Sequence, residues 1–390
     1  MVRSPFSSIG LILLLWCAGL GAAGQFAKIA VPFDLIGARY PDSGAGLGLL
    51  LSMISFAGIV LGLTAGIFVA RYGFRRLLVI GLMVGAGCSI WQSTLPGFPV
   101  MLASRVVEGL SHLVIVVAAP TLIAQVSSDR LRGSAMTLWS TFFAVAFSIV
   151  AWLGLPLAQV FGVQLLFLIH GGVMAALAAL VWWWFLDEDN SPAVPGDHLG
   201  LVEILQQHRA AYRSAFIAAP AMGWLFYTLT FVSLVAILPG LLPHGQRAAV
   251  VGLMPVASIG VSLLIVTPLL RYWPAVRIVM AGFALSALVL CGHWLGFPPA
   301  ATCIALFAAL GLVQGASFAS IPQLNATARD RALANGAMAQ MGNLGNTLGT
   351  PVLMLVLQRG GTGGMLAVVI LFYVVGILLH MWMQRRRDLS

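Results

Sequence analysis

Three ionisable side chains fall on one face of a single apolar segment. Arg105, Glu108 and His112 occupy positions i, i+3 and i+7 within residues 99–126, a spacing that brings side chains to one side of a helix. An ionisable group at the centre of a bilayer costs about 2.5 kcal/mol or more, so it needs a partner or a function. In one interpretation Glu108 binds and releases a proton, Arg105 tunes that carboxyl group or binds an anion, and His112 relays the proton. In the other interpretation Arg105 and Glu108 form a structural ion pair.

Further polar residues lie in the first apolar segment. Gln25 and Lys28 are three positions apart, and Lys28 is the only lysine in the chain. Lys28 either attracts an anionic substrate inside the protein or extends its amine to the outer membrane interface.

The second half of the chain has neutral polar residues in its apolar segments in place of acids. Candidate substrate contacts there are Tyr227, Gln314, Gln340 and Asn343. Gln340 and Asn343 are three positions apart and therefore share a helical face. This amide face serves either hydrogen bonding between helices or contact with a substrate.

The composition requires a lipid environment for these segments. Of the 390 residues, 60% are hydrophobic and 8% are charged, whereas about a quarter of the residues of a soluble domain are charged. A spanning helix needs about 20 apolar residues. Most arginines lie at the ends of apolar runs, as membrane anchors do, so the basic charge does not indicate a nucleic-acid partner.

The arrangement of apolar runs predicts twelve spans and their orientation. Fifteen of the twenty basic residues fall on one side, which the positive-inside rule assigns to the cytoplasm. Both termini are then cytoplasmic in the inner membrane, and so is a polar linker at 187–212 with a short amphipathic helix. The linker joins an N-terminal bundle, 1–186, to a C-terminal bundle, 213–390. The predicted spans are 7–31, 45–69, 77–95, 99–126, 133–158, 163–186, 213–240, 247–270, 276–296, 299–323, 332–357 and 363–383.

The two predicted bundles share an internal repeat. Matched pairs occur in the same order at offsets of 200 to 206 residues: Arg71-Tyr72 with Arg271-Tyr272, Glu108-Gly109 with Gln314-Gly315, and Asp129-Arg130 with Asp330-Arg331. Two parallel six-span halves that rock about a site near the midplane form a transporter architecture.

The tight basic hairpin between the second and third predicted spans resembles the signature of the major facilitator superfamily. The matching residues are Gly66, Arg71, Gly73, Arg75 and Arg76.

Arg105 followed by Gly109 resembles a second motif of the same family. The resemblance implies an all-α membrane protein with twelve transmembrane helices in two pseudo-symmetric six-helix bundles, and a cavity-facing position for Arg105.

The resemblance also implies a cytoplasmic gate at the hairpin, with one departure. Ala70 stands where the family has an aspartate that helps hold the cytoplasmic ends together. We expect other acids to act in its place in the cytoplasm-closed state. The expected pairs join Asp129 to Arg71, Arg75 or Arg76, and Asp330 to Arg271 or Arg277.

These features predict a secondary active transporter that works by alternating access. The expected substrate is a small polar organic solute, anionic or zwitterionic because the candidate charges are mostly cationic, and Glu108 is the expected proton-coupling group. The alternative is an efflux transporter for hydrophobic drugs or metabolites. Metal transport is less favoured, because the methionines are scattered and no motif links His112 or His170, which lie on different spans, to methionine.

No enzyme activity, cofactor or bound metal is expected, because no nucleophile is paired with a base and no metal-ligand spacing occurs. The expected partners are the substrate, protons and the lipid bilayer, and the chain is expected to act as a monomer.

Overall fold

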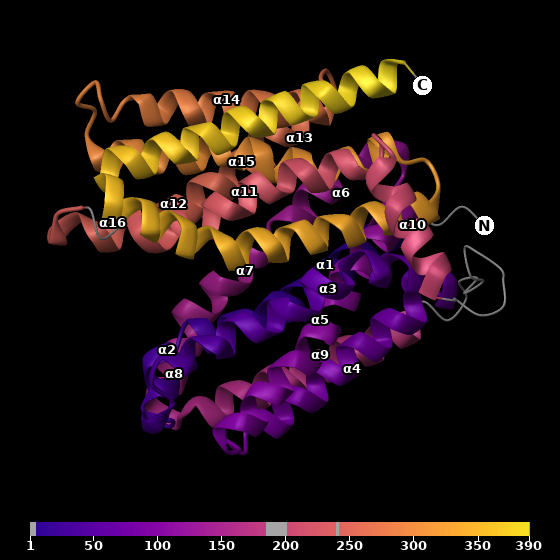
Figure 1. Cartoon of the computed structure of the whole chain (residues 1–390). Coiled ribbons are helices and arrows are strands. Elements are labelled where there is room, and N and C mark those ends of the chain that lie inside the picture. The colour runs from indigo at the N-terminus through magenta and orange to yellow at the C-terminus, as the bar shows by residue number, and fades with distance from the viewer. Residues whose placement is uncertain (1–4, 185–200, 239–241, 390) are drawn as a thin grey trace. The chain divides into compact units, whose positions relative to one another are not determined.

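The computed structural model describes residues 5–184, 201–238 and 242–389, and within these ranges the chain is helical with short turns and no strands (Figure 1). In the first part of the chain the helices are α1 Pro5–Ala30, α2 Phe33–Gly37, α3 Leu49–Tyr72, α4 Phe74–Gln92, α5 Phe98–Val126, α6 Asp129–Ser140, α7 Phe142–Ile149, α8 Leu155–Phe161 and α9 Val163–Trp184. A 3-10 segment, Pro41–Gly48, precedes α3, and a π-helical segment, Val150–Gly154, joins α7 to α8.

In the second part the helices are α10 Leu201–Arg213, α11 Ala218–Ile237, α12 His244–Val261, α13 Thr267–Leu269, α14 Ala275–Cys291, α15 Pro299–Leu324 and α16 Ala328–Asp388. The π-helical segment Ser262–Val266 joins α12 to α13. The second part of the predicted linker is helical, as α10, while the part at 187–200 lies outside the described residues; the amphipathic character of this helix stays a prediction.

The twelve predicted spans agree with these helices. Within the described ranges, ten helices are long and apolar enough to cross a membrane. One of them, α16, contains two spans, because Gly361 breaks its 61 residues with a φ of 64°, a conformation that glycine adopts without a steric penalty. The shorter apolar helix α14 supplies the remaining span.

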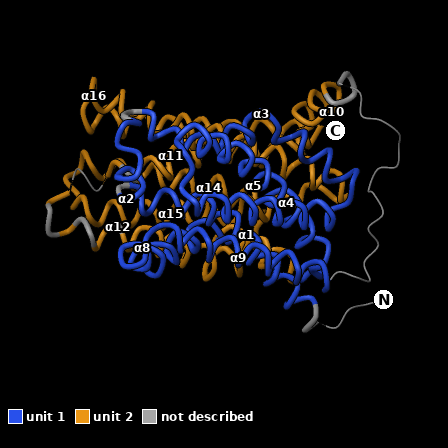
Figure 2. The backbone as a smooth tube through the Cα atoms, turned by 90° about the horizontal axis from the view of Figure 1, so that it is seen from below, with its two compact units in different colours: residues 1–130, 142–204 blue, residues 131–141, 205–390 orange. Residues whose placement is uncertain are grey.

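The chain forms two compact units, which Figure 2 colours separately. Unit 1 consists of residues 1–130 and 142–204, and unit 2 of residues 131–141 and 205–390. Most of α6 is thus grouped with unit 2, and the change of unit between Ile204 and Leu205 falls inside α10. The boundary at 186/213 stays a prediction.

Each unit is built around one buried helix. In unit 1, α5 packs against α1, α3 and α4, and α4 also packs against α9. In unit 2, α15 packs against α11, α12 and α14, and α11 packs along α16. Glycines lie where the central helices α5 and α15 contact adjacent helices. Neighbouring backbones can therefore come close to the central helix, as they do at small residues between membrane helices.

Corresponding glycine contacts give the structural register of the repeat. A Cβ atom at Gly109 would collide with the carbonyl oxygen of Ile54 on α3, and one at Gly311 would collide with the carbonyl oxygen of Ser258 on α12. Gly81 on α4 faces α5 in the same way that Gly282 on α14 faces α15. The offsets are 202 and 201 residues, so Gly311 corresponds to Gly109.

A methyl group at Gly109 should destabilise the fold, because the α3 backbone blocks the space that it would occupy. For Gly109→Ala we expect a loss of about 1–3 kcal/mol, the usual cost of overpacking, measured as a lower apparent unfolding temperature in detergent. Gly87→Ala is the matched control, because a Cβ atom there meets nothing within 4 Å. Equal unfolding temperatures for the two variants would contradict this packing.

Candidate functional site

A charge cluster, defined here as Lys28, Arg105 and Glu108, lies at the centre of unit 1. Lys28 comes from α1, and Arg105 and Glu108 come from α5. All three residues have an exposed fraction of 0%. The structure therefore brings together three of the residues that the sequence singles out, and none of them is exposed.

Both oxygens of the Glu108 carboxylate accept charge-assisted hydrogen bonds. Lys28 Nζ donates to Oε1 at 2.5 Å, and Arg105 Nη1 donates to Oε2. Gln92 Nε2 on α4 also donates to Oε2, at 2.9 Å. Ser89 Oγ, also on α4, lies farther away, 3.5 Å from Oε1. One carboxylate thus has three close donors from three helices, and hydrogen bonds to an ionised carboxylate favour the charged form.

The donors themselves are held by neighbouring groups. Arg105 Nε donates to the carbonyl oxygen of Leu50 on α3 at 2.9 Å, and Gln92 Nε2 also donates to Ser104 Oγ at 2.9 Å. Arg105 Nη2 and Gln92 Oε1 are buried without a hydrogen-bond partner among the described residues. The guanidinium is therefore fixed between α3 and Glu108 but is not fully satisfied.

Lys28 connects the cluster to a second chain of hydrogen bonds. Its Nζ donates to Ser89 Oγ on α4 at 2.5 Å and lies 5.5 Å from the ring centre of Phe167. Ser89 Oγ lies 2.8 Å from His170 Nδ1 on α9, and His170 Nε2 lies 2.9 Å from the carbonyl oxygen of Gly21.

Unit 2 has apolar side chains at the positions that correspond to Arg105, Glu108 and Ser89 of unit 1. With the offsets given by the glycine contacts, Arg105 corresponds to Phe307, Glu108 to Leu310 and Ser89 to Leu290. These three side chains are buried in the core of unit 2. The same helix packing can therefore be built without ions. Well-packed apolar residues often stabilise a protein as much as a buried ion pair or more, so packing alone does not explain the charge cluster.

The two other candidates in unit 1 lie near the cluster but are not bonded to Glu108. His112 Nδ1 lies 3.0 Å from the carbonyl oxygen of Ala22, and its ring packs edge-on against Phe26 at 4.9 Å. Gln25 Nε2 donates to Ser111 Oγ at 2.8 Å.

In unit 2, Tyr227 and Gln314 belong to one hydrogen-bonded group. Gln314 Oε1 accepts from Tyr227 at 3.0 Å and from Ser258 at 2.7 Å, and Gln314 Nε2 donates to the carbonyl oxygen of Ser140 at 2.7 Å. The Tyr227 ring also stacks on Trp224, with centres 4.5 Å apart. Gln314 is therefore held by partners inside unit 2.

Gln340 and Asn343 lie apart from that group. Tyr212 on α10 donates to Gln340 Oε1 at 2.6 Å, which ties the linker helix to α16. Burial raises the pKa of the Tyr212 phenol well above its usual range, so the hydroxyl keeps the proton that it donates. Asn343 Nδ2 donates to the carbonyl oxygen of Ala339 on its own helix at 2.7 Å.

The predicted gate hairpin is the turn between α3 and α4. Gly73 has a φ of 94°, which explains the glycine at this position. Arg75 lies with its guanidinium 4.5 Å from the ring centre of Trp182 and donates to the Trp182 carbonyl oxygen at 2.9 Å. Gly66 is buried in α3.

The arginines on the second hairpin, Arg271 and Arg277, are exposed. Thr327 donates to the carboxylate of Asp330 at 2.7 Å and caps α16 by accepting from the Asp330 amide. Pairing of Asp129 and Asp330 with the hairpin arginines concerns the cytoplasm-closed state and stays a prediction.

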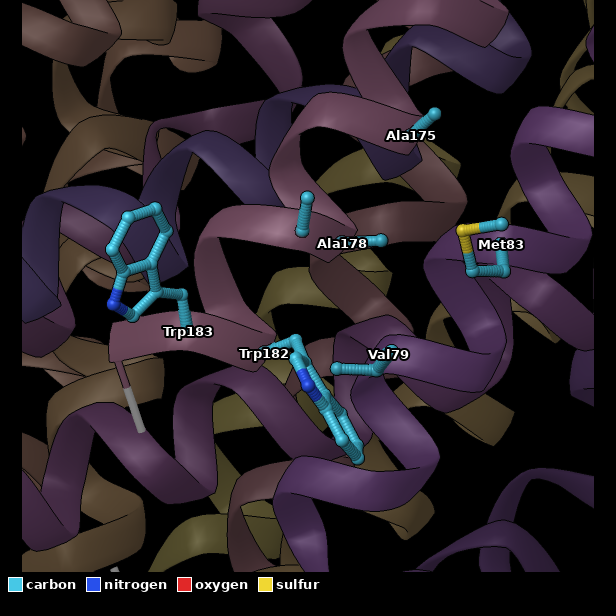
Figure 3. Close-up of a pocket in the computed structure, with 7 residues that line it drawn as sticks. Val79, Met83, Ala175, Ala178, Trp182 and Trp183 are labelled. Atoms are coloured by element: carbon cyan, nitrogen blue, oxygen red, sulfur yellow. The ribbon is translucent and has the colours of Figure 1, made fainter. Parts of the chain in front are cut away.

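An apolar groove opens between α4 and α9 (Figure 3). It has a volume of ≈ 640 Å³ and is lined by Val79, Met83, Ala175, Ala178, Ala179, Trp182 and Trp183. None of these side chains is ionisable, so the groove suits an apolar molecule and offers no charged partner to a polar one.

Sequence reasoning missed Ser89, Gln92 and His170. Ser89 and Gln92 are three positions apart on α4, so a shared polar face was a visible signal. His170 was considered only as a metal ligand, and its partner Ser89 is 81 positions away in the sequence. Among the described residues, no group of three or more His, Cys, Asp or Glu side chains could hold a metal ion.

Comparison with known proteins identifies relatives of the whole architecture. The family model described as Major Facilitator Superfamily matches residues 11–326. The crystal structure of the human organic anion transporter MFSD10 (TETRAN) is similar with a TM-score of 0.75 and 16% identity, covering 97% of this chain and 100% of that chain.

Two proton symporters are also similar in structure. The E. coli fucose:proton symporter FucP gives a TM-score of 0.70 and 14% identity, covering 97% of this chain and 99% of that chain. The proton:xylose symporter XylE, bound to 6-bromo-6-deoxy-D-glucose, gives a TM-score of 0.73 and 12% identity, covering 98% and 96%. At these identities the likeness shows the fold alone.

Removing the carboxylate from the charge cluster should destabilise unit 1. Glu108→Gln leaves two buried cations without their anion, and breaking a buried pair in this way costs about 3–5 kcal/mol. We expect a marked fall in the apparent unfolding temperature and loss of transport.

The matched variant replaces the whole cluster by apolar residues and takes those at positions 105 and 108 from the corresponding positions of unit 2. Lys28→Met, Arg105→Phe and Glu108→Leu together should recover most of the stability lost in Glu108→Gln, because no unpaired charge remains, yet should leave transport absent. Transport by this triple variant would show that the cluster has only a structural role.

Proposed function

The chain belongs to the Major Facilitator Superfamily, and we propose that it is a proton-coupled secondary active transporter for a small polar organic solute. Members of this family are transporters rather than enzymes, and the apolar helices are those of an integral membrane protein. Transport would proceed by alternating access, in which two bundles move relative to a site near the midplane.

The observation that carries the proposal is the buried charge cluster. An ionised triad inside a membrane helix bundle is expensive and marks a functional site by default. In unit 2 the positions that correspond to Arg105 and Glu108 are filled by the buried apolar residues Phe307 and Leu310. A cluster of titratable groups that packing does not require is suited to binding and releasing a proton during the transport cycle.

The charges of the cluster support a polar substrate. Two cations, Lys28 and Arg105, face one carboxylate, Glu108, and this excess of positive charge favours an anionic or zwitterionic solute. Among the similar structures, MFSD10 is described as an organic anion transporter, and FucP and XylE as proton symporters of fucose and xylose. Sugars and small organic anions are therefore the first classes to test.

The proposed location is the inner membrane, with both termini in the cytoplasm. Arg385, Arg386 and Arg387 end α16, and fifteen of the twenty basic residues fall on this predicted side. Positive residues near span ends favour the cytoplasmic face. We propose that the chain acts as a monomer.

The apolar groove between α4 and α9 favours a second candidate, an efflux transporter for hydrophobic compounds. Its lining combines Trp182 and Trp183 with small and aliphatic side chains, a surface on which a flat apolar molecule can pack. The two candidates differ in substrate polarity and in the direction of transport.

Uptake into proteoliposomes tests the main proposal. A screen of sugars, organic anions and zwitterions by thermal shift first identifies a solute that stabilises the purified protein, because a ligand that binds only the folded state raises its stability. We expect uptake of that solute to rise when a pH gradient is imposed and to return to the basal level when a protonophore collapses the gradient. Uptake that ignores the gradient would contradict proton coupling.

The efflux candidate is tested by growth of cells with and without the protein in the presence of hydrophobic drugs. We expect equal susceptibility, because the charge cluster is suited to a polar solute. Increased resistance that is abolished by Ala179→Trp, which places a large ring at an exposed position of the groove, would favour the second candidate instead. Gly87→Ala serves as the control, because its new methyl group lies in open space.

A further inference from the structure

The charge cluster is not electrically balanced. Lys28, Arg105 and Glu108 are all fully buried, and when all three are ionised they carry two positive charges and one negative charge. An arginine does not lose its proton in a protein. A net charge without a partner in an apolar interior is strongly unfavourable. The group that should exchange a proton is therefore the one whose gain or loss of a proton makes the cluster neutral.

Protonation of Glu108 makes the imbalance worse. It would leave two buried cations with no anion and would remove the acceptor that Lys28, Arg105 and Gln92 share. Deprotonation of Lys28 has the opposite effect. It leaves the ion pair of Arg105 with Glu108 and a neutral amine, with no net charge.

A directed hydrogen-bond chain leads away from Lys28. The Gly21 carbonyl oxygen can only accept, so His170 Nε2 carries a hydrogen and, in the neutral ring, Nδ1 is an acceptor. Ser89 therefore donates its hydroxyl hydrogen to His170 Nδ1, at 2.8 Å, and not to the more distant Glu108 Oε1, at 3.5 Å. Ser89 Oγ in turn accepts from Lys28 Nζ, at 2.5 Å.

We propose that Lys28, and not Glu108, carries the coupled proton, and that Ser89 and His170 relay it. The inference rests on the proposed function, which it refines. The step is balanced: a Lys28 N–H bond breaks as its proton passes to Ser89 Oγ, while the Ser89 hydroxyl proton passes to His170 Nδ1. The products are a neutral Lys28 amine and a His170 imidazolium that still donates to Gly21.

Among the groups around Lys28, His170 is the one suited to accept its proton. Arg105 is already protonated, and Glu108 is held ionised by its three donors. Cys88 on α4 is a buried thiol, whose sulfur is only a weak acceptor, and His112 on α5 is directed to the Ala22 carbonyl oxygen. His170 is also partly exposed, whereas Lys28 is fully buried. The relay therefore moves the charge out of the most enclosed position.

Two substitutions of Lys28 test the proton carrier. Lys28→Met mimics the neutral amine and leaves the Arg105–Glu108 pair balanced, so it should fold. Lys28→Arg keeps a positive charge that is not released. The measurement is the ratio of solute uptake with and without an imposed pH gradient in proteoliposomes. For both variants this ratio should fall to about one, because a gradient can shift only steps that involve a proton.

The relay is tested by Ser89→Ala and His170→Gln. The gradient-driven part of uptake should slow about tenfold or more, because a positioned proton-transfer group contributes at least this much. His380→Gln is the control: His380 is a buried histidine of unit 2 with no hydrogen-bond partner, and its variant should keep the wild-type ratio. Wild-type rates in both Ser89→Ala and His170→Gln would overturn the relay.

Comparison of wild-type and variant uptake distinguishes failure of proton coupling from failure of Lys28 as the proton carrier. If wild-type uptake is not stimulated by the gradient, proton coupling fails and the inference fails with it. If wild-type uptake is stimulated and Lys28→Met and Lys28→Arg are stimulated equally, coupling stands but Lys28 is not the carrier.

Discussion

A single carboxylate buried between two cations is the interaction on which the proposed chemistry of unit 1 depends. Glu108 connects α1, α4 and α5, because Lys28, Gln92 and Arg105 each donate to it. Lys28, Arg105 and Glu108 are fully buried, and an ionisable group inside a membrane bundle is costly without a partner, so each group requires the others. The cluster thus restrains three helices and concentrates titratable groups in one place. A transporter needs both properties at the point where proton binding is to influence conformation.

The comparison between the two units separates packing from function. Both units place a buried helix at the centre and let a neighbour approach closely at a glycine, Gly109 in α5 and Gly311 in α15. The steric requirement is the same in each unit, and the same residue type meets it. The charge requirement differs, since Phe307 and Leu310 fill the positions that Arg105 and Glu108 occupy in unit 1. The two units therefore share close packing at these positions, whereas the buried ion pairs of Lys28 and Arg105 with Glu108 lie in unit 1.

The neutral polar residues of unit 2 have a different character. Gln314 is engaged by Tyr227, Ser258 and Ser140, and Gln340 is engaged by Tyr212 of the linker helix. Hydrogen bonds of this kind hold membrane helices together at modest energy, about 0.6 kcal/mol each on average. Such bonds can be exchanged during a conformational change at lower cost than the ion pairs of unit 1. This difference suits a protein in which unit 1 holds the titratable groups and unit 2 exchanges hydrogen bonds during the conformational change.

The sequence by itself determined the all-helical membrane fold, the twelve spans and the family, because long apolar runs and charged hairpins are local properties of the chain. It also placed Arg105 and Glu108 on one face, because helical spacing is local as well. Only the tertiary structure decided that Lys28 reaches Glu108, 80 residues away, and that Ser89 and His170 extend the contact. The tertiary structure also corrected the repeat: the counterpart of Gly109 in unit 2 is Gly311, one helical turn from the Gly315 that the sequence match indicates. The reason is that the register between packed helices depends on where their backbones meet, which similarity of sequence does not determine.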